Sequence, residues 1–208
     1  MKPTKPICVA ITGASGAAYG LRLIECLLHV GHPVYLLVTT PGQIVIAMET
    51  ELKFPGRPAD IERFLNTHYG VDEGQLRVFG KDEWTAPMAS GSGAPEAMVV
   101  CPCTMGALSA IACGSSRNLM ERSADVMLKE RKKLVLVARE TPLSAIHLEN
   151  MLRLTHAGAV ILPANPGFYH NPTGINDLVD FVVARVLDQI GVEHDLIGRW
   201  GEQHDPEQ

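Results

Sequence analysis

Leu134-Val135-Leu136-Val137-Ala138-Arg139-Glu140-Thr141-Pro142 decides the fold, because a purely apolar run ends abruptly in a cation and an anion. Five apolar residues without polar alternation are typical of a parallel strand covered on both faces. Arg139 and Glu140 therefore lie at its carboxyl end, which in open α/β sheets is the edge where ligands bind. Thr141-Pro142 has the pattern of a helix N-cap followed by proline, so a helix is expected to begin there. The stretch predicts a site for anionic chemistry.

Similar apolar runs alternate with helical patterns along the chain, as in βαβ units with a parallel sheet. Strands are predicted at residues 7–12, 34–39, 98–101, 134–138 and 159–162, with a weaker candidate at 76–79. Helices are predicted near residues 17–30, 43–49, 59–68, 105–113, 123–130, 143–156 and 175–190. We expect one α/β domain over residues 1–208, with a Rossmann-like or flavodoxin-like parallel sheet and helices on both faces. A C-terminal tail, residues 192–208, is expected to pack near the active site or a neighbouring subunit.

Composition excludes several classes of protein. The 208 residues are 46% hydrophobic and 20% charged, enough for a full core. A net charge of −5 gives no general attraction to nucleic acid. No apolar run approaches the roughly 20 residues that span a bilayer, and the run at 7–12 is too short for a secretory signal. Five cysteines, an odd number, favour reduced thiols. We expect a cytoplasmic protein that binds neither nucleic acid nor membrane.

The loop Gly13-Ala14-Ser15-Gly16 joins the first predicted strand to the first helix through small residues. Free amides at a helix N-terminus, with the helix dipole behind them, favour an anion. The spacing is not that of a dinucleotide fingerprint, and the Walker lysine is missing. A tight turn that needs glycine for packing explains this loop alone equally well.

A second strand-to-helix turn, Pro102-Cys103-Thr104-Met105-Gly106-Ala107, has the same small and hydroxylated character, so two turns could hold one mononucleotide. Cys101 and Cys103 suggest a metal, but no second cysteine pair or suitably spaced histidine completes a ligand set. His147-Leu148-Glu149 resembles half of a zinc-deaminase signature in the wrong order. No metal site is predicted.

Two basic residues, Arg122 and Lys129, lie seven apart on one predicted helix, so they project on the same side and could jointly meet an anion. Lys132 and Lys133 are interpreted as a solvated face. Tyr169 follows the last predicted strand and Arg185 lies on the next helix, and each alone is weak evidence.

Taken together, motifs in order over nearly the whole chain resemble the UbiX family of flavin prenyltransferases, once called aromatic-acid or polyprenylbenzoate decarboxylases. They are Gly13-Ala14-Ser15-Gly16-Ala17, Met48-Glu49, Ala89-Ser90-Gly91-Ser92, Cys101-Pro102-Cys103-Thr104, Leu128-Lys129-Glu130-Arg131, Arg139-Glu140-Thr141-Pro142-Leu143, His147-Leu148-Glu149-Asn150-Met151, Gly167-Phe168-Tyr169 and Arg199-Trp200-Gly201. The resemblance implies that the protein binds FMN and transfers a prenyl group to it from dimethylallyl phosphate without a metal ion. It also implies a homododecamer and a UbiD-type decarboxylase that receives the prenylated FMN.

The resemblance also implies roles for individual residues. FMN would be held by Gly13, Ala14, Ser15, Thr39, Thr104, Met105, Gly106, Ala107 and Arg139. The donor would be bound by Ser90, Arg122, Lys129, Tyr169 and Arg185, of which Arg122 and Lys129 could come from a neighbouring subunit. Catalysis would involve Ser15, Glu49, Lys129, Glu140 and Trp200, with the two glutamates moving protons and Trp200 offering a π surface to the prenyl group. Thr39 and Thr104 commonly correspond to serines in relatives, which keeps the hydroxyl.

Alternatives remain for the function and for two of the residues. The chain could be a direct aromatic-acid decarboxylase, a flavoprotein decarboxylase acting on peptidyl or pantothenoyl cysteine, or an FMN carrier without chemistry. Glu140 could be the ion-pair partner of a nearby arginine, and Glu49 a solvent-facing helix end.

Overall fold

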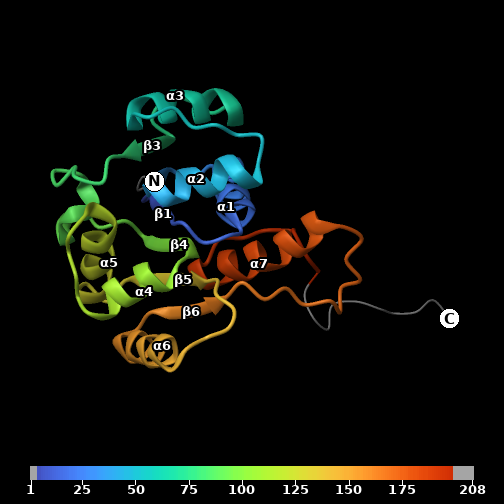
Figure 1. Cartoon of the computed structure of the whole chain (residues 1–208). Helices are drawn as coiled ribbons and strands as arrows, with labels where there is room; N and C mark the ends of the chain where they lie inside the picture. Colours follow the sequence, from blue (N-terminus) through green and yellow to red (C-terminus); the bar gives the residue numbers. More distant parts are fainter. Residues whose placement is uncertain (1–3, 199–208) are drawn as a thin grey trace.

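Six parallel strands form the centre of the protein in a computed structural model that describes residues 4–198 (Figure 1). The strands are β1 (Ile7–Ile11), β2 (Val34–Val38), β3 (Leu76–Phe79), β4 (Ala97–Cys103), β5 (Lys133–Ala138) and β6 (Val160–Pro163). Their order across the sheet is β3-β2-β1-β4-β5-β6, the order of the doubly wound Rossmann sheet. The predicted fold class is confirmed, and the weaker strand candidate at 76–79 is a strand.

Helices cover both faces of this sheet. They are α1 (Ala17–His29), α2 (Thr40–Glu49), α3 (Pro58–Tyr69), α4 (Met105–Ala112), α5 (Leu119–Lys129), α6 (Ala145–Ala157) and α7 (Ile175–Ile190), with short 3-10 turns η1 (Pro87–Ala89) and η2 (Gly91–Gly93) before β4. One core cluster joins the sheet to α1, α2, α3 and α7, and the other joins it to α4, α5 and α6. Every residue of β1 and β4 is buried, because helices lie over both sides.

Capping side chains move the starts of three helices away from the predicted positions. α2 begins at Thr40 because the Thr39 hydroxyl accepts the Gly42 N–H, and α5 begins at Leu119 because the Asn118 side chain caps it. The prediction that a helix starts at Thr141-Pro142 is wrong. α6 starts at Ala145, where the Ser144 hydroxyl accepts the His147 N–H at 3.3 Å. The Thr141–Pro142 peptide is cis and lies before the helix.

The two neighbouring cysteines of β4 face opposite sides of the sheet. Cys101 packs in the cluster under α1 and α7, whereas Cys103 packs in the cluster under α4 and α5. The pairing of β4 with β5 shifts register between Val100 and Cys103, so the usual rule that residues two apart share a face does not hold. Burial raises the pKa of both thiols, that of Cys103 to about 12.

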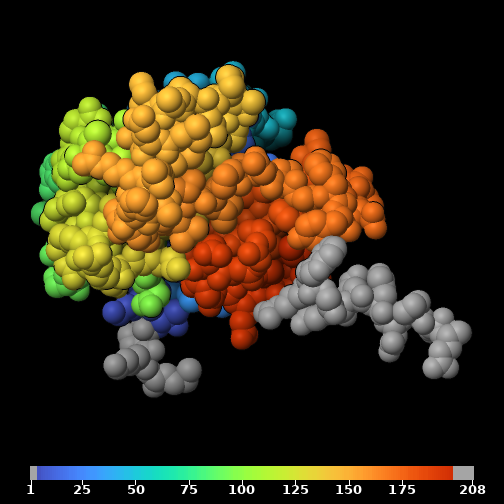
Figure 2. Space-filling view, turned by 90° about the horizontal axis from the view of Figure 1, so that it is seen from below, coloured from blue at the N-terminus to red at the C-terminus, as the bar shows by residue number. Residues whose placement is uncertain are grey.

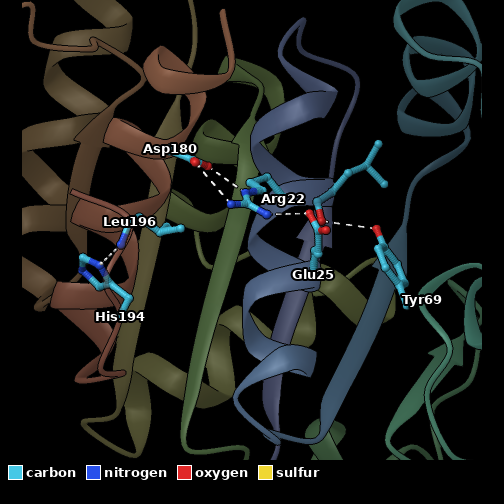
Figure 3. A network of polar contacts seen from close by, with 7 residues as sticks. Arg22, Glu25, Tyr69, Asp180, His194 and Leu196 are labelled. Carbon is cyan, nitrogen blue, oxygen red and sulfur yellow. Dashed lines mark hydrogen bonds and ion pairs between the residues drawn. The ribbon is translucent and has the colours of Figure 1, made fainter. Parts of the chain in front are cut away.

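Partly buried ion pairs of Arg22 hold α7 against α1 (Figure 3). Arg22 on α1 donates from Nε and NH2 to the two carboxylate oxygens of Asp180 on α7, at 2.7 and 3.2 Å, and from NH1 to Glu25. This two-pronged geometry fixes the orientation of α7 on the sheet. The loop that precedes α7 projects from the body of the molecule beside it (Figure 2).

The predicted C-terminal tail is described only to residue 198. Val192 is buried, and Leu196 and Ile197 pack against the core cluster under α1 and α7. His194 contacts Asp188 at the end of α7. The first part of the tail therefore packs on its own chain, whereas Trp200 lies outside the described residues.

Candidate functional site

The crevice of the sheet lies between β1 and β4, where the strand order reverses, and Thr12 joins its two sides. The Thr12 hydroxyl donates to the carbonyl of Pro102 at 2.7 Å and accepts from the Thr104 N–H at 2.9 Å. The sequence analysis gave Thr12 no role, although its place as the first polar residue after a buried strand was the available signal. Ligands of doubly wound sheets bind at this switch point.

The turn that enters α1 needs glycine at two positions. A Cβ atom on Gly13 would lie 2.4 Å from Cβ of Pro41, so the start of α2 packs directly against the turn. Gly16 has a φ of +104°, a left-handed conformation that L side chains rarely adopt. Packing and backbone conformation therefore both require glycine in this loop. The N–H groups at the start of α1 have a further contact.

Those amides bind Glu49, the last residue of α2. Glu49 Oε2 accepts from the N–H groups of Gly16 and Ala17, both at 2.9 Å. Partial burial would raise the Glu49 pKa, but hydrogen bonds from Ser15, Ala17 and Gly16 and the charge of Arg139 together lower it. These two amides are therefore not free in this structure, because an internal carboxylate accepts from both at the helix N-terminus.

Arg139 connects the end of β5 to the same turn. Its Nε donates to the carbonyl of Ser15 at 3.2 Å, and its backbone N–H donates to Cys103. Glu140 beside it is exposed and accepts the Thr141 N–H at 3.2 Å. Among residues 4–198, no ion pair involves Glu140. The alternative of a structural ion pair for Glu140 therefore has no support in this part of the chain.

Thr39 and Thr104 cap the two other helices that begin at the crevice. Thr39 Oγ1 accepts the Gly42 N–H at 3.1 Å, and Thr104 Oγ1 accepts the Ala107 N–H at 3.1 Å. A Cβ on Gly106 would meet nothing closer than 3.9 Å, so the start of α4 is open to a neighbouring group. We call Ser15, Glu49, Thr39, Thr104 and Arg139 the carboxyl-edge cluster.

Three other predicted site residues, Ser90, Arg122 and Lys129, form a second group, which we call the amino-edge cluster. Arg122 donates from Nε to the carbonyl of Ala89 at 3.0 Å and pairs with Asp125 at 2.7 Å. Lys129 pairs with Glu130, and a Cβ on Gly91 would lie within 3.1 Å of its ammonium nitrogen. The turn that contains Ser90 thus packs on the end of α5.

Lys129 of the amino-edge cluster and Arg139 of the carboxyl-edge cluster lie at opposite ends of β5. Lys129 precedes β5 and Arg139 follows it, and six residues of extended strand span roughly 20 Å at about 3.3 Å per residue. Lys132 donates to the carbonyls of Ala94 and Pro95 just before β4, so its interpretation as a solvated residue is wrong. One chain does not bring Lys129 and Arg139 into one site.

Tyr169 and Arg185 meet around Phe181 of α7. The Tyr169 ring lies edge-on to Phe181, with centroids 5.6 Å apart. Phe181 and Arg185 line a small hollow of about 260 Å³ beside β6, and Arg185 pairs with Asp188. Tyr169 follows β6 and lies beyond the same ends of the strands as Arg139, whereas Arg185 lies further along α7 in a hollow that also includes Val160 at the start of β6.

Two larger hollows differ in their relation to the crevice. One of about 630 Å³ is lined by Thr39 and Pro41 together with apolar residues of β2 and β3, so it adjoins the carboxyl-edge cluster. The other, about 690 Å³, lies between α1 and α3 beside Arg22 and Tyr69 and includes none of the predicted site residues. We place the candidate site at the crevice, because Ser15, Glu49, Thr39, Thr104 and Arg139 of the carboxyl-edge cluster come together there.

A Rossmann-ordered sheet whose crevice collects three helix starts, a carboxylate and an arginine is the architecture of a nucleotide- or flavin-binding α/β protein. The comparisons agree: the sequence model of the family named Flavoprotein matches residues 1–187. The Flavin prenyltransferase UbiX of Pseudomonas aeruginosa is 55% identical over 204 residues, 98% of this chain and 98% of that protein. The chain therefore belongs to the UbiX family of flavoproteins.

Solved structures give the same family. The crystal structure of AnUbiX (PadA1) in complex with FMN and dimethylallyl pyrophosphate has a TM-score of 0.85 and 39% identity, over 97% of this chain and 100% of that one. A dodecameric FMN-dependent UbiX-like decarboxylase from Escherichia coli O157:H7 has a TM-score of 0.81 and 38% identity, over 94% and 98%. These findings confirm the resemblance that the motifs indicated.

Within residues 4–198, no three or more His, Cys, Asp or Glu side chains are grouped so that they could hold a metal ion. None of the helices described there is both long and apolar enough to cross a membrane.

Proposed function

We propose that this protein is a flavin prenyltransferase that joins the dimethylallyl group of dimethylallyl phosphate to N5 and C6 of reduced FMN. The observation that carries the proposal is the convergence of Arg139 and Glu49 on the Ser15 turn at the switch point of the sheet, in a chain 55% identical to a UbiX flavin prenyltransferase. The product, prenylated FMN, would serve a UbiD-type decarboxylase.

The residues of the crevice fit a mononucleotide. Gly13, Ala14, Ser15, Thr39, Thr104, Met105, Gly106, Ala107 and Arg139 would hold FMN, which supplies the nucleophilic nitrogen and carbon of its reduced ring. The open space beside Gly106 leaves room for close approach of a ligand to the start of α4. Because Glu49 occupies the α1 amides, we place the FMN phosphate at the starts of α2 and α4 rather than at α1.

In this proposal the cationic side chains stabilise the leaving phosphate and the carboxylates transfer protons. Departure of phosphate from an allylic carbon leaves an anion, which fixed cations stabilise without reorganisation. Arg139, Arg185 and Tyr169 would contact this anion from one chain. Glu49, whose lowered pKa keeps it ionised near neutrality, can accept a proton but not supply one, whereas the exposed Glu140 is placed to exchange protons with phosphate. Ser15 would orient the flavin edge, and Trp200 would offer a π surface to the prenyl group.

A neighbouring subunit would complete the site. Lys129 lies before β5, at the opposite end of that strand from Arg139, and is too far from it to act with it in one chain. Arg122 is tied to the turn of Ser90 through the carbonyl of Ala89. In a homododecamer, the assembly of the UbiX-like structure from Escherichia coli, the amino-edge cluster of one chain can face the carboxyl-edge cluster of another. We further propose the cytoplasm as the compartment, which the five free cysteines support.

One incubation tests this function against its rivals. Protein with reduced FMN and dimethylallyl phosphate should yield a flavin heavier by one dimethylallyl unit in the mass spectrum, and EDTA should not prevent it. Release of carbon dioxide from an aromatic acid with unchanged flavin would instead establish a direct decarboxylase. Unchanged flavin with no carbon dioxide released from an aromatic acid would leave an FMN carrier or a decarboxylase of peptidyl or pantothenoyl cysteine.

A further inference from the structure

Thr12 is a buried polar residue at the centre of the crevice, with 2% of its surface exposed. It is the first residue after β1 and is joined to the end of β4, 90 residues further along the chain. Its backbone N–H and its hydroxyl both donate to the Pro102 carbonyl, at 3.3 and 2.7 Å. The same hydroxyl accepts the N–H of Thr104 at 2.9 Å. One side chain thus links the two turns that flank the switch point.

This link sets where α4 begins. Thr104 holds the Ala107 N–H through its own hydroxyl at 3.1 Å, so the chain of hydrogen bonds runs from β1 through Thr12 and Thr104 to the first turn of α4. The pairing of β4 with β5 shifts register between Val100 and Cys103 and resumes at Cys103, so Thr104 lies one residue beyond the last paired residue of β4. The Thr12 hydroxyl accepts the N–H of this first residue outside the ladder.

We infer that Thr12 is a positioning residue for flavin binding: its hydroxyl holds the Thr104–Ala107 turn in the conformation that receives FMN. The inference rests on the proposed function only in taking FMN as the ligand. A residue without a hydroxyl at this position would leave the Thr104 N–H unpaired in a buried site, and the turn would move to satisfy it.

Three variants separate positioning from simple stability. Thr12→Val keeps the shape and removes both hydroxyl hydrogen bonds, whereas Thr12→Ser keeps the hydroxyl. Ser123→Ala is the matched control, because the Ser123 hydroxyl is equally buried and donates to the Leu119 carbonyl at 2.7 Å, within α5. The FMN dissociation constant is measured by flavin fluorescence and the melting temperature by circular dichroism.

Thr12→Val should weaken FMN binding by roughly tenfold, a change that corresponds to about 1.4 kcal/mol, because the turn loses both hydroxyl hydrogen bonds that hold it in the binding conformation. The KM for dimethylallyl phosphate should stay unchanged. Ser123→Ala should lower the melting temperature about as much as Thr12→Val does, without changing FMN affinity. Thr12→Ser should match the wild type in both measurements. The inference would be overturned if a folded Thr12→Val protein bound FMN with wild-type affinity. It would also be overturned if Thr12→Val and Ser123→Ala lost FMN affinity equally.

Should Thr12→Val fail to fold, hydrogen exchange on the wild-type protein gives a second test. The Thr104 amide should be protected before FMN is added, because Thr12 already holds it. Rapid exchange of that amide in the FMN-free protein would refute the positioning role. Formation of prenylated FMN by the wild type tests the proposed function separately, so the two failures are distinguishable.

Discussion

The carboxyl-edge and amino-edge clusters contain similar residue types but are held in place by different means. At the carboxyl edge, Glu49 and Arg139 bind backbone groups of the Ser15 turn. At the amino edge, Arg122 and Lys129 pair with the nearby carboxylates of Asp125 and Glu130, and such partly exposed pairs contribute little to rigidity. Arg122 also donates to the carbonyl of Ala89, so Lys129 is the charged residue of this cluster without a backbone contact, which suits it to serve a neighbouring subunit.

The largest expected effect lies at the carboxyl edge. Glu140→Gln keeps the reach of the side chain but removes its ability to carry a proton, so turnover should fall by roughly 10²–10⁴-fold with FMN binding intact. Single-turnover kinetics with reduced FMN measures this, with Glu149→Gln, an exposed carboxylate on α6, as the control. A stable Glu140→Gln protein with wild-type turnover would remove Glu140 from catalysis.

Mixing variants tests directly whether the two clusters act across subunits. Arg139→Ala and Lys129→Ala should each lower turnover on the order of 10²-fold, the usual cost of removing one electrostatic contact to the transition state. Hetero-oligomers refolded from both should regain activity, because some interfaces then combine two intact clusters. Lys133→Ala, at the exposed start of β5, is the control. No recovery in verified mixed oligomers would mean that each chain uses its own clusters.

A negative charge introduced into the Ser15 turn should weaken FMN binding rather than slow turnover. Ser15→Asp places a carboxylate beside Glu49 and in the crevice that receives an anionic flavin, at a cost on the order of 1–4 kcal/mol. Fluorescence titration should show at least tenfold weaker FMN binding, whereas Ser15→Ala should lose much less. Equal affinities for the two variants would leave the turn with a packing role alone.

The smallest effect concerns the stability that Glu49 contributes. Its pKa in the folded protein is lower than the ordinary value of 4.5, so its stabilisation is present above pH 4.5 and is lost as the pH falls through the folded pKa. The carboxylate is largely exposed, so the contribution should stay below about 1 kcal/mol. Melting temperatures of wild type and Glu49→Gln should differ at pH 7 and converge in acid. A difference that grew on acidification would contradict the hydrogen-bonded carboxylate.

The hydrophobic pattern of the sequence predicted the architecture well. Each apolar run forms a strand that is covered on both faces, and the charged residues beside it lie at the strand ends because burying an unpaired charge is costly. This reasoning correctly placed Arg139 at the carboxyl edge and found β3. It was less successful at helix starts, because the start depends on which amide a capping side chain reaches: Asn118 caps α5, and Ser144 rather than Thr141 caps α6. The proline pattern at Thr141-Pro142 was overruled by the Ser144–His147 pair.

The sequence alone therefore determined the parallel sheet, the family and the residue types of the site, since these depend on patterns and motifs that are local in the chain. Only the tertiary structure showed that Glu49 accepts from the α1 amides and that Thr12 joins the two turns. These facts depend on contacts between residues up to 92 positions apart, which no local pattern encodes.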